Sequence, residues 1–275
     1  MPQNIKQKVS FKNPPVIEVS ATVQFADLPQ DWALTNLEKV RAAVGVNDYP
    51  KIEFKPPLGK LVPLQIPNEL SFKLSSDQEF EFPRIWLMSE DETHLIQIQN
   101  DRLSFNWRKL PESSNADYSK FDLVWKKFKD GCVGLDNLIK QEVGQHLQVQ
   151  AIELAYLNSI PFKAFGGVEK IDTCMKHFIS HSDAELIGVP TQINFLWEFN
   201  LQGTILKAQG LTIKDPNTGD QVLRFDLVTR KFSPSPIKVD SSEFEDWFDI
   251  AHDRIIDSFV SLTADTMHEK WGKYS

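Results

Sequence analysis

The strongest candidates for a binding site are polar side chains that alternate along one short segment. Arg102, Asn106 and Arg108 are separated by even spacings, and residues at even spacings share one face of a β-strand. Arg84 lies in a neighbouring short segment, and Trp107 is expected on the opposite face. Guanidinium and amide donors on a sheet face suit a carboxylate, a phosphate or single-stranded nucleic acid. The alternatives are a structural polar network between sheet and helix, or plain exposure to solvent.

Two histidines have the spacing of a metal site. His177 and His181 are four residues apart, and Asp183 and Glu185 follow them. On a continuous helix both imidazoles face one way and can bind one metal ion. The alternative, which we favour, is the frayed end of a helix, where a histidine suits the negative end of the helix dipole.

Four carboxylates follow one stripe of the predicted closing helix: Asp246, Asp249, Asp253 and Asp257. His252 and Arg254 lie beside this stripe. Carboxylates at this spacing can serve acid–base chemistry or bind a cation. A solvated acidic helix face is the more common explanation. A catalytic site would need this stripe to approach the arginine-bearing strand, and His252 is therefore included among the candidate binding residues.

The motifs that identify common enzyme classes do not occur. The chain contains no GxxxxGK[ST], GxGxxG, GxSxG, HExxH or CxxC sequence. Cys132 and Cys174 lie among apolar residues, where we expect small buried hydrophobic side chains in a reducing compartment. The sequence therefore predicts no cofactor, no metal and no catalytic residue, and it favours a protein that is not an enzyme.

Composition favours a folded chain that avoids polyanions. Of the 275 residues, 41% are hydrophobic, with 19 Phe and 7 Trp, and the formal net charge is -8. Such a chain has ample material for a core, while its negative charge disfavours nucleic acid and anionic membranes. We find no signal peptide at the N-terminus and no apolar run of 18 residues, and we expect a cytoplasmic protein without membrane contact.

Hydrophobic periodicity predicts a first set of elements between residues 1 and 148. A period of two indicates strands and a period near 3.6 indicates helices. The predicted elements are a strand over Pro15–Phe25, a helix that ends near Gly45, strands over Arg84–Met88, His94–Gln99 and Arg102–Arg108, and a long helix over Asp117–His146. The prolines between Val46 and Pro83 leave room only for short strands.

A second set of elements follows from residue 149 onward. The predicted elements are a strand over Val149–Asn158, a helix over Val168–Ile179, strands over Gln192–Phe199, Thr204–Ile213 and Gln221–Arg230, and a closing helix from Ser242 to about Gly272. Pro234 and Pro236 are expected to interrupt the chain after the last strand.

Each half reads strand, helix, at least three antiparallel strands, long helix. We therefore predict an α+β fold made of two tandem sheet-plus-helix units, residues 1–148 and 149–275, which could pack as one compact body. The order resembles TATA-binding-protein-like or helix-grip architectures. This likeness concerns the fold and implies no function.

Three groups of residues carry a family resemblance: Asn13-Pro14-Pro15-Val16-Ile17-Glu18, the segment Leu95–Arg108 with its Gln-Asn-Asp-Arg and Phe-Asn-Trp-Arg runs, and Ala251-His252-Asp253, Phe259, His268 and Trp271-Gly272. Over nearly its whole length the chain resembles a sporadically distributed family of uncharacterised bacterial proteins. The tyrosine-proline expected after the central segment is present only as Tyr118-Ser119. The resemblance assigns no catalytic residues. The patchy distribution of the family is typical of phage-defence or toxin–antitoxin modules.

The leading functional hypothesis is a non-enzymatic binding or regulatory component of such a system. Its partner would be a protein, namely a toxin, an effector or a phage protein. One alternative is a nuclease or phosphoesterase with an undescribed site. Another is a small-ligand or nucleotide sensor that holds its ligand between a long helix and the sheet.

Overall fold

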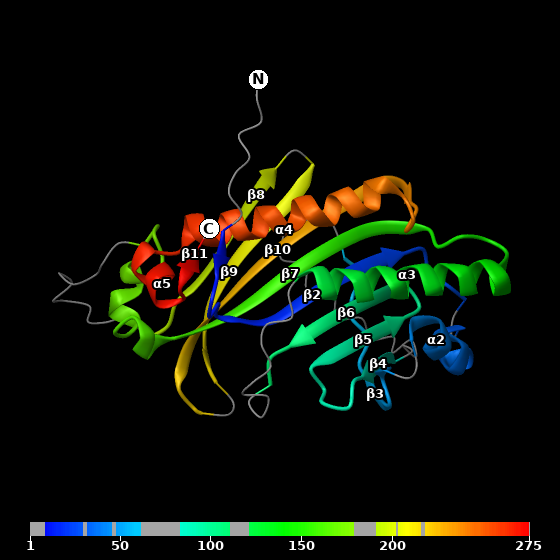
Figure 1. Ribbon diagram of the computed structural model, residues 1–275, viewed down its shortest axis with the longest axis horizontal. Helices are drawn as coiled ribbons and strands as arrows, with labels where there is room; N and C mark the ends of the chain where they lie inside the picture. The colour runs from blue at the N-terminus through cyan, green and yellow to red at the C-terminus, as the bar shows by residue number, and fades with distance from the viewer. Residues whose placement is uncertain are drawn as a thin grey trace, which may run out of the picture. The chain divides into compact units, whose positions relative to one another are not determined.

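The computed structural model is a mixed α+β fold with a large antiparallel sheet (Figure 1). It describes residues 9–29, 32–45, 48–61, 83–110, 121–178, 191–201, 203–215 and 218–274. The sheet has the strand order β3-β4-β5-β6-β2-β7-β10-β9-β8, and a separate two-stranded sheet pairs β1 with β11.

The strands of both sheets are β1 (Ser10–Phe11), β2 (Val16–Phe25), β3 (Lys51–Lys55), β4 (Arg84–Met88), β5 (His94–Gln99), β6 (Arg102–Arg108), β7 (Val149–Pro161), β8 (Asn194–Leu201), β9 (Thr204–Lys214), β10 (Gln221–Ile237) and β11 (Lys273–Tyr274). The α-helices are α1 (Trp32–Thr35), α2 (Leu37–Val44), α3 (Phe121–Val143), α4 (Ser242–Leu262) and α5 (Asp265–Lys270). Two 3-10 helices, η2 (Phe162–Ala164) and η3 (Val168–Thr173), follow β7.

The chain divides into two compact units that are not consecutive in sequence. Unit 1 contains Met1–Val19, Ala155–Thr229 and Asp249–Ser275, and unit 2 contains Ser20–Leu154 and Arg230–Phe248. The division falls within β2, β7, β10 and α4. The expected boundary after residue 148 and the duplication stay predictions.

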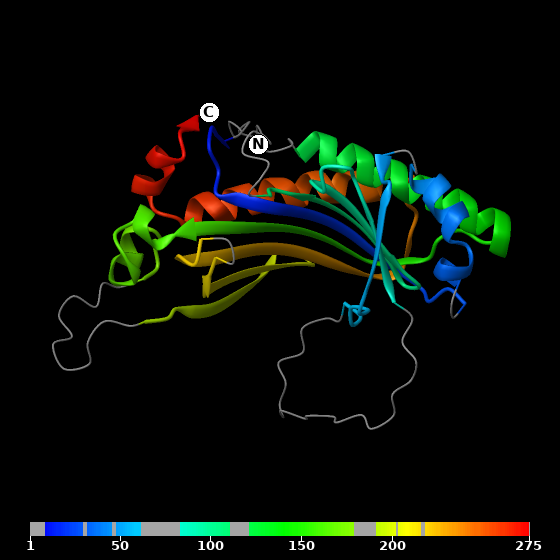
Figure 2. The same cartoon turned by 90° about the horizontal axis from the view of Figure 1, so that it is seen from below.

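In unit 2 the core lies between α3 and one face of the strands (Figure 2). Leu103, Phe105 and Trp107 of β6 alternate onto this face and are each at most 2% exposed. Phe128 and Cys132 of α3 are buried as well. Burial of these side chains removes a large apolar area from water, which is the main stabilising contribution to the unit.

An aromatic cluster joins α3 to the first turns of α4 within unit 2. Trp125 stacks on Phe248 with ring centroids 4.7 Å apart, and Phe128 meets the same ring edge to face at 5.2 Å. Phe244 lies 5.3 Å from Phe248 and completes the cluster. Offset and edge-to-face rings gain energy beyond the area they bury, so this cluster fixes the start of α4.

In unit 1 the chain ends are held together by strand pairing and by rings. Ser10 pairs with Tyr274, and the Asn13 N–H donates to the Trp271 carbonyl at 2.9 Å. The ring of Phe11 lies 5.5 Å from Phe259 of α4. The pairing of β1 with β11 and the contacts of Phe11 and Asn13 therefore hold the two ends of the described chain together, and we call this arrangement the clasp.

Most expected elements are confirmed. The strands β4, β5 and β6 begin and end at the predicted residues, and the long helix after them is one uninterrupted element, α3. Gly45 ends α2 with a left-handed φ of 96°, as a C-cap glycine should. Between Val46 and Pro83 the structure has the short strand β3, while the alternating residues from Leu70 to Phe82, which favoured short strands, lie outside the described residues.

The predicted helix over Val168–Ile179 is wrong. Only the short 3-10 helix η3 forms there, and Lys170 inside it already has non-helical φ and ψ angles. The residues after it hydrogen-bond elsewhere: Met175 forms a bridge with Thr263, and the Lys176 N–H donates to the Leu262 carbonyl at 2.9 Å. These tertiary bonds take the backbone groups that a helix would need.

Two other boundaries differ from expectation. Pro234 and Pro236 lie within β10, where both are exposed and an extended backbone suits proline. The closing helix does not continue to Gly272, because α4 ends at Leu262 and α5 begins at Asp265. The Ala264 N–H donates to the Cys174 carbonyl at 2.8 Å, a bond that a continuous helix would exclude.

Gly134 allows α2 and α3 to approach closely, and its replacement tests this packing. A Cβ at this position would lie 2.0 Å from the carbonyl oxygen of Ala43, so one of the two helices must move. We expect Gly134→Ala to lower the free energy of unfolding by about 2 kcal/mol, measured by urea denaturation.

Gly131 of the same helix is the matched control. A Cβ there meets no atom within 4 Å, and Gly131→Ala should leave stability unchanged or raise it by about 1 kcal/mol. Equal effects of the two substitutions would contradict the proposed close approach.

Candidate functional site

The predicted arginines lie together on the face of the unit 2 strands opposite the α3 core. Directly paired residues share a face, and the register pairs Gln99 with Arg102 and Gln97 with Trp86. Arg84 shares the face of Trp86, two residues further along β4. The arginine face therefore comprises Arg84, Trp86, Gln97, Gln99, Arg102, Ser104, Asn106 and Arg108. Trp107 is 1% exposed on the other face.

Arg102 is buried among neutral groups. It is 5% exposed, and its Nη2 donates to Gln24 Oε1 at 3.1 Å and to the Gly59 carbonyl at 2.7 Å. Its Nε has no hydrogen-bond acceptor among the described residues. Burial lowers the pKa of the Arg102 guanidinium from its ordinary value. The segment that supplies Gly59 covers this end of the arginine face.

Trp86 is the centre of the half-buried part of the face. The Cζ atoms of Arg84 and Arg108 lie 5.3 Å and 5.4 Å from its ring, and Lys55 Nζ lies 4.8 Å from it. Cations at these distances are attracted by the electron-rich ring face. The indole thus holds three positive charges near one another.

Gln97 links this cluster to Asn106. Its Oε1 accepts hydrogen bonds from Arg84 Nη1 at 2.6 Å and from Trp86 Nε1 at 3.1 Å. Its Nε2 donates to Asn106 Oδ1 at 2.8 Å. Sequence reasoning missed Trp86 and Gln97. Trp86 is two residues from Arg84 and Gln97 is two residues from Gln99, so each shares the face of that neighbour.

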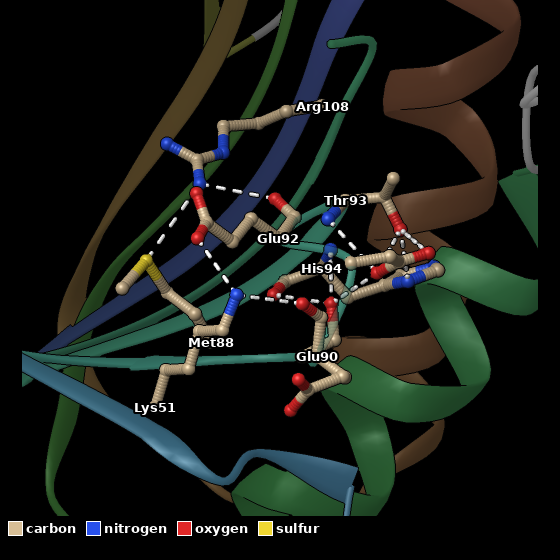
Figure 3. Close-up of polar contacts among 9 residues, drawn as sticks. Lys51, Met88, Glu90, Glu92, Thr93, His94 and Arg108 are labelled. Carbon is tan, nitrogen blue, oxygen red and sulfur yellow. Dashed lines mark hydrogen bonds and ion pairs between the residues drawn. The ribbon is translucent and has the colours of Figure 1, made fainter. Parts of the chain in front are cut away.

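Arg108 is fixed by the turn between β4 and β5 (Figure 3). Its Nη2 donates to the Glu92 carbonyl at 3.0 Å. Lys51 Nζ donates to the Glu92 carboxylate at 2.9 Å and to the Glu90 carbonyl at 2.7 Å. Glu92 has a left-handed φ of 58°, and these bonds hold that conformation. One end of the arginine face therefore has a rigid frame.

His94 lies in the same turn region, with its side chain on the core face. Its Nδ1 is 3.0 Å from Thr93 Oγ1, and its ring is 5.9 Å from Phe105. Burial, helped by the charge of Lys127, lowers the pKa of His94 below its ordinary value. The neutral imidazole is therefore favoured in the folded protein.

His252 belongs to unit 1, unlike the arginines. Its ring is 6.0 Å from Tyr156, and its Nδ1 is 3.7 Å from Asp253 Oδ1. The stripe of carboxylates that accompanies it on α4 is exposed: Asp246, Asp249, Asp253 and Asp257. Within the described ranges, no three His, Cys, Asp or Glu side chains are grouped so as to hold a metal ion.

His177 lines an apolar groove in unit 1, a site that sequence reasoning missed. The groove has a volume of about 630 Å³ and is lined by strands β8 and β9 and by α4, through His177, Trp197, Phe199, Leu201, Leu206, Asp257, Ser258, Ser261 and Leu262. The other members of the proposed metal site, His181, Asp183 and Glu185, lie outside the described residues.

Trp197, which lines the groove, belongs to an aromatic row on β8. Phe195 and Trp197 have ring centroids 4.5 Å apart, and His177 meets Trp197 edge to face at 6.0 Å. The ring of Phe195 covers Gly210, its register partner, where a Cβ would lie 2.0 Å from a ring carbon. A glycine in β9 therefore makes room for this row.

β8 is also an edge strand of the large sheet. Among the described strands only β9 pairs with it, so its other edge presents unpaired backbone groups. Leu196 is 54% exposed and Phe199 is 37% exposed. This position could not be read from the sequence, because alternation identifies a strand but not its neighbours.

Comparisons with models of protein families and with curated proteins found no match to this chain. The helices in the described part of the chain also lack the combination of length and hydropathy that crossing a bilayer requires. The candidate sites of the described residues are thus the arginine face of unit 2 and the groove of unit 1.

The buried histidine predicts how stability depends on pH. Because the folded state lowers the pKa of His94, the unfolded chain binds its proton more tightly. The contribution of His94 is therefore fully present above the unfolded pKa of about 6.5 and is lost as the pH falls through the folded value. The free energy of unfolding, measured by urea denaturation, should fall less between pH 8 and pH 5 in the His94→Gln variant than in the parent. Parallel pH profiles for the two proteins would refute this.

Proposed function

We propose that this chain is a non-enzymatic binding or regulatory protein that acts through protein contacts, as part of a bacterial phage-defence or toxin–antitoxin-like system in the cytoplasm. The setting rests on the family resemblance. The binding activity rests on the groove of unit 1 and its edge strand. The partner would be a toxin, an effector or a phage protein.

The observation that carries the proposal is the coincidence of an unpaired strand edge with an apolar groove. An extended segment of a partner can add to an edge strand through main-chain hydrogen bonds, and its side chains then enter adjacent pockets. β8 offers the edge, and the row of Trp197, Phe199 and Leu201 offers apolar contacts. Aromatic side chains of this kind are enriched in the centres of protein interfaces.

Charge favours a protein partner over nucleic acid. The chain has a formal net charge of -8, and the exposed carboxylates of α4 add to the negative potential of unit 1. Asp257 itself lines the groove. A polyanion would be repelled from this region, whereas a segment that mixes apolar and basic residues would fit it.

The nuclease or phosphoesterase alternative has less support. It requires His252 and the acidic stripe to share a site with Arg102, Asn106 and Arg108. The contacts of His252 include Tyr156 and Asp253 of its own unit, and Asn106 is bound by Gln97. These bonds suit structural roles.

A small-ligand or nucleotide sensor is the second candidate function. The groove volume of about 630 Å³ lies in the range of small-molecule sites. The groove lies between the long helix α4 and the strands β8 and β9, which is where a helix-grip fold would hold a ligand. A helix-grip-like fold built by tandem duplication is therefore part of this second proposal. Release of a bound small molecule on denaturing the protein purified from its native host would favour this function.

Phe199→Ser is the direct test of the groove, with Leu211→Ser as matched control. Both side chains are 37% exposed, but Leu211 pairs with Asn194 and so lies on the opposite face of the β8–β9 hairpin from Phe199. We expect Phe199→Ser to weaken partner binding at least about tenfold, whereas Leu211→Ser leaves it unchanged.

The measurement has two steps. The tagged chain is isolated from its native host, and any stoichiometric protein partner is purified and returned to the parent and variant chains in a calorimetric titration. The absence of a stable macromolecular partner would count against the proposal. Equal weakening by both substitutions would show that the groove is not the contact surface.

A further inference from the structure

Three cations around the arginine face are paired with carboxylates. Lys51 is paired with Glu92, Lys55 with Glu53, and Arg230 with Glu153. In contrast, Arg84, Arg102 and Arg108 have no carboxylate oxygen within 4.0 Å among the described residues. In a chain with a net charge of -8, three arginines without a carboxylate partner on one face require an explanation.

Arg102 is the most deeply buried of the three arginines. A guanidinium that is 95% buried loses most of its hydration, and neutral acceptors compensate only part of that loss. Among the described residues, its acceptors are the Gln24 amide oxygen and the Gly59 carbonyl, and its buried Nε has none. Asp101 and Glu153 are the carboxylates whose negative charges act on the Arg102 guanidinium. Asp101 accepts a hydrogen bond from Gln99, and Glu153 accepts one from Arg230.

Arg84 repeats this pattern beside Arg102. The register places both arginines in one row across the sheet, with Gln99 between them. Within the described ranges, Arg84 donates one hydrogen bond, from Nη1 to Gln97 Oε1, and its buried Nε has no acceptor. Two neighbouring guanidinium groups repel each other unless an anion lies between them or beside them.

The donors are also held in place. Gln97 orients Arg84, the Glu92 carbonyl orients Arg108, and the ring of Trp86 lies beside both guanidinium groups. A guanidinium has five N–H donors, so several donors of Arg84 and Arg108 have no acceptor in the part of the chain that the structure describes. Preorganised forks of this kind match the paired oxygens of a phosphate or a carboxylate.

We propose that the arginine face binds an oxyanion, a phosphate or carboxylate group, with Arg84 and Arg102 as its main donors and Arg108 on the other side of Trp86. This site lies wholly in unit 2 and is independent of the groove. Its failure would leave the protein-contact function untouched, because no partner protein enters its test.

The probe is inorganic phosphate, titrated calorimetrically into the full chain at constant ionic strength set with chloride. We expect saturable binding with a Kd of about 1 mM, and Arg84→Gln to weaken it at least tenfold. Acetate in a parallel titration shows whether a carboxylate binds better than a phosphate. Saturable binding of either anion that depends on Arg84 supports the site.

Arg224→Gln is the matched control, because Arg224 is an arginine of unit 1 that already pairs with Asp226. It should bind phosphate as the parent does. Equal loss in both variants, or full binding by Arg84→Gln, would show adventitious binding and overturn the proposal. Absence of saturable binding to the parent would overturn it without reference to any variant.

The chain's own acidic residues provide a final control. Glu69, Asp77, Glu79 and Glu81 lie outside the described residues. In a variant chain, all four are changed to the corresponding amides. If this variant binds phosphate and the parent does not, the arginines bind these carboxylates in the parent and the proposal fails. Binding by the parent of the same strength as by this variant supports an external ligand.

Discussion

Leu103, Phe105 and Trp107 are buried against α3, and this burial determines which way every other side chain of β6 must face. Side chains alternate along a strand, so the arginines and Asn106 necessarily lie on the opposite surface. A shift of one residue in the pairing of β5 with β6 would place guanidinium groups in the core. The cost of burying those charges makes the observed register strongly preferred. The core of unit 2 therefore also specifies the chemistry of its other face.

A rigid sheet is a good support for recognition, because its side chains keep their mutual distances when a ligand arrives. The two sites described here use this property differently. On the arginine face the sheet presents donors from its surface, and the turn at Glu92 and the side chain of Gln97 hold them. In the groove of unit 1 the sheet presents an edge, and the aromatic row beside it supplies apolar area. The first arrangement suits a compact anion and the second suits an extended segment.

Local patterns in the sequence were sufficient for β4, β5, β6 and α3, because alternation and helical periodicity are properties of neighbouring residues. They were also sufficient to place Arg102, Asn106 and Arg108 on one face, whereas the shared face of Arg84 follows only from the register of β4 and β5. They failed for Val168–Ile179, where bonds to residues near Leu262 replaced a helix that the apolar spacing favoured. A ligand site between a long helix and the sheet was one hypothesis, but the residues that line the groove were not foreseen, since they depend on β8 being the last strand of the sheet and on α4 lying beside it. Strand order is set by contacts between distant residues, which a single sequence does not display.

The clasp between β1 and β11 has a practical consequence for engineering. Ser10 and Tyr274 are register partners, so a short flexible peptide between these two positions could join β1 to β11 covalently. New termini could then be opened in an exposed turn such as the one around Gly219, between β9 and β10. Such a circular permutant would keep every strand pairing while moving an affinity tag or a fluorescent label away from Phe11 and Trp271.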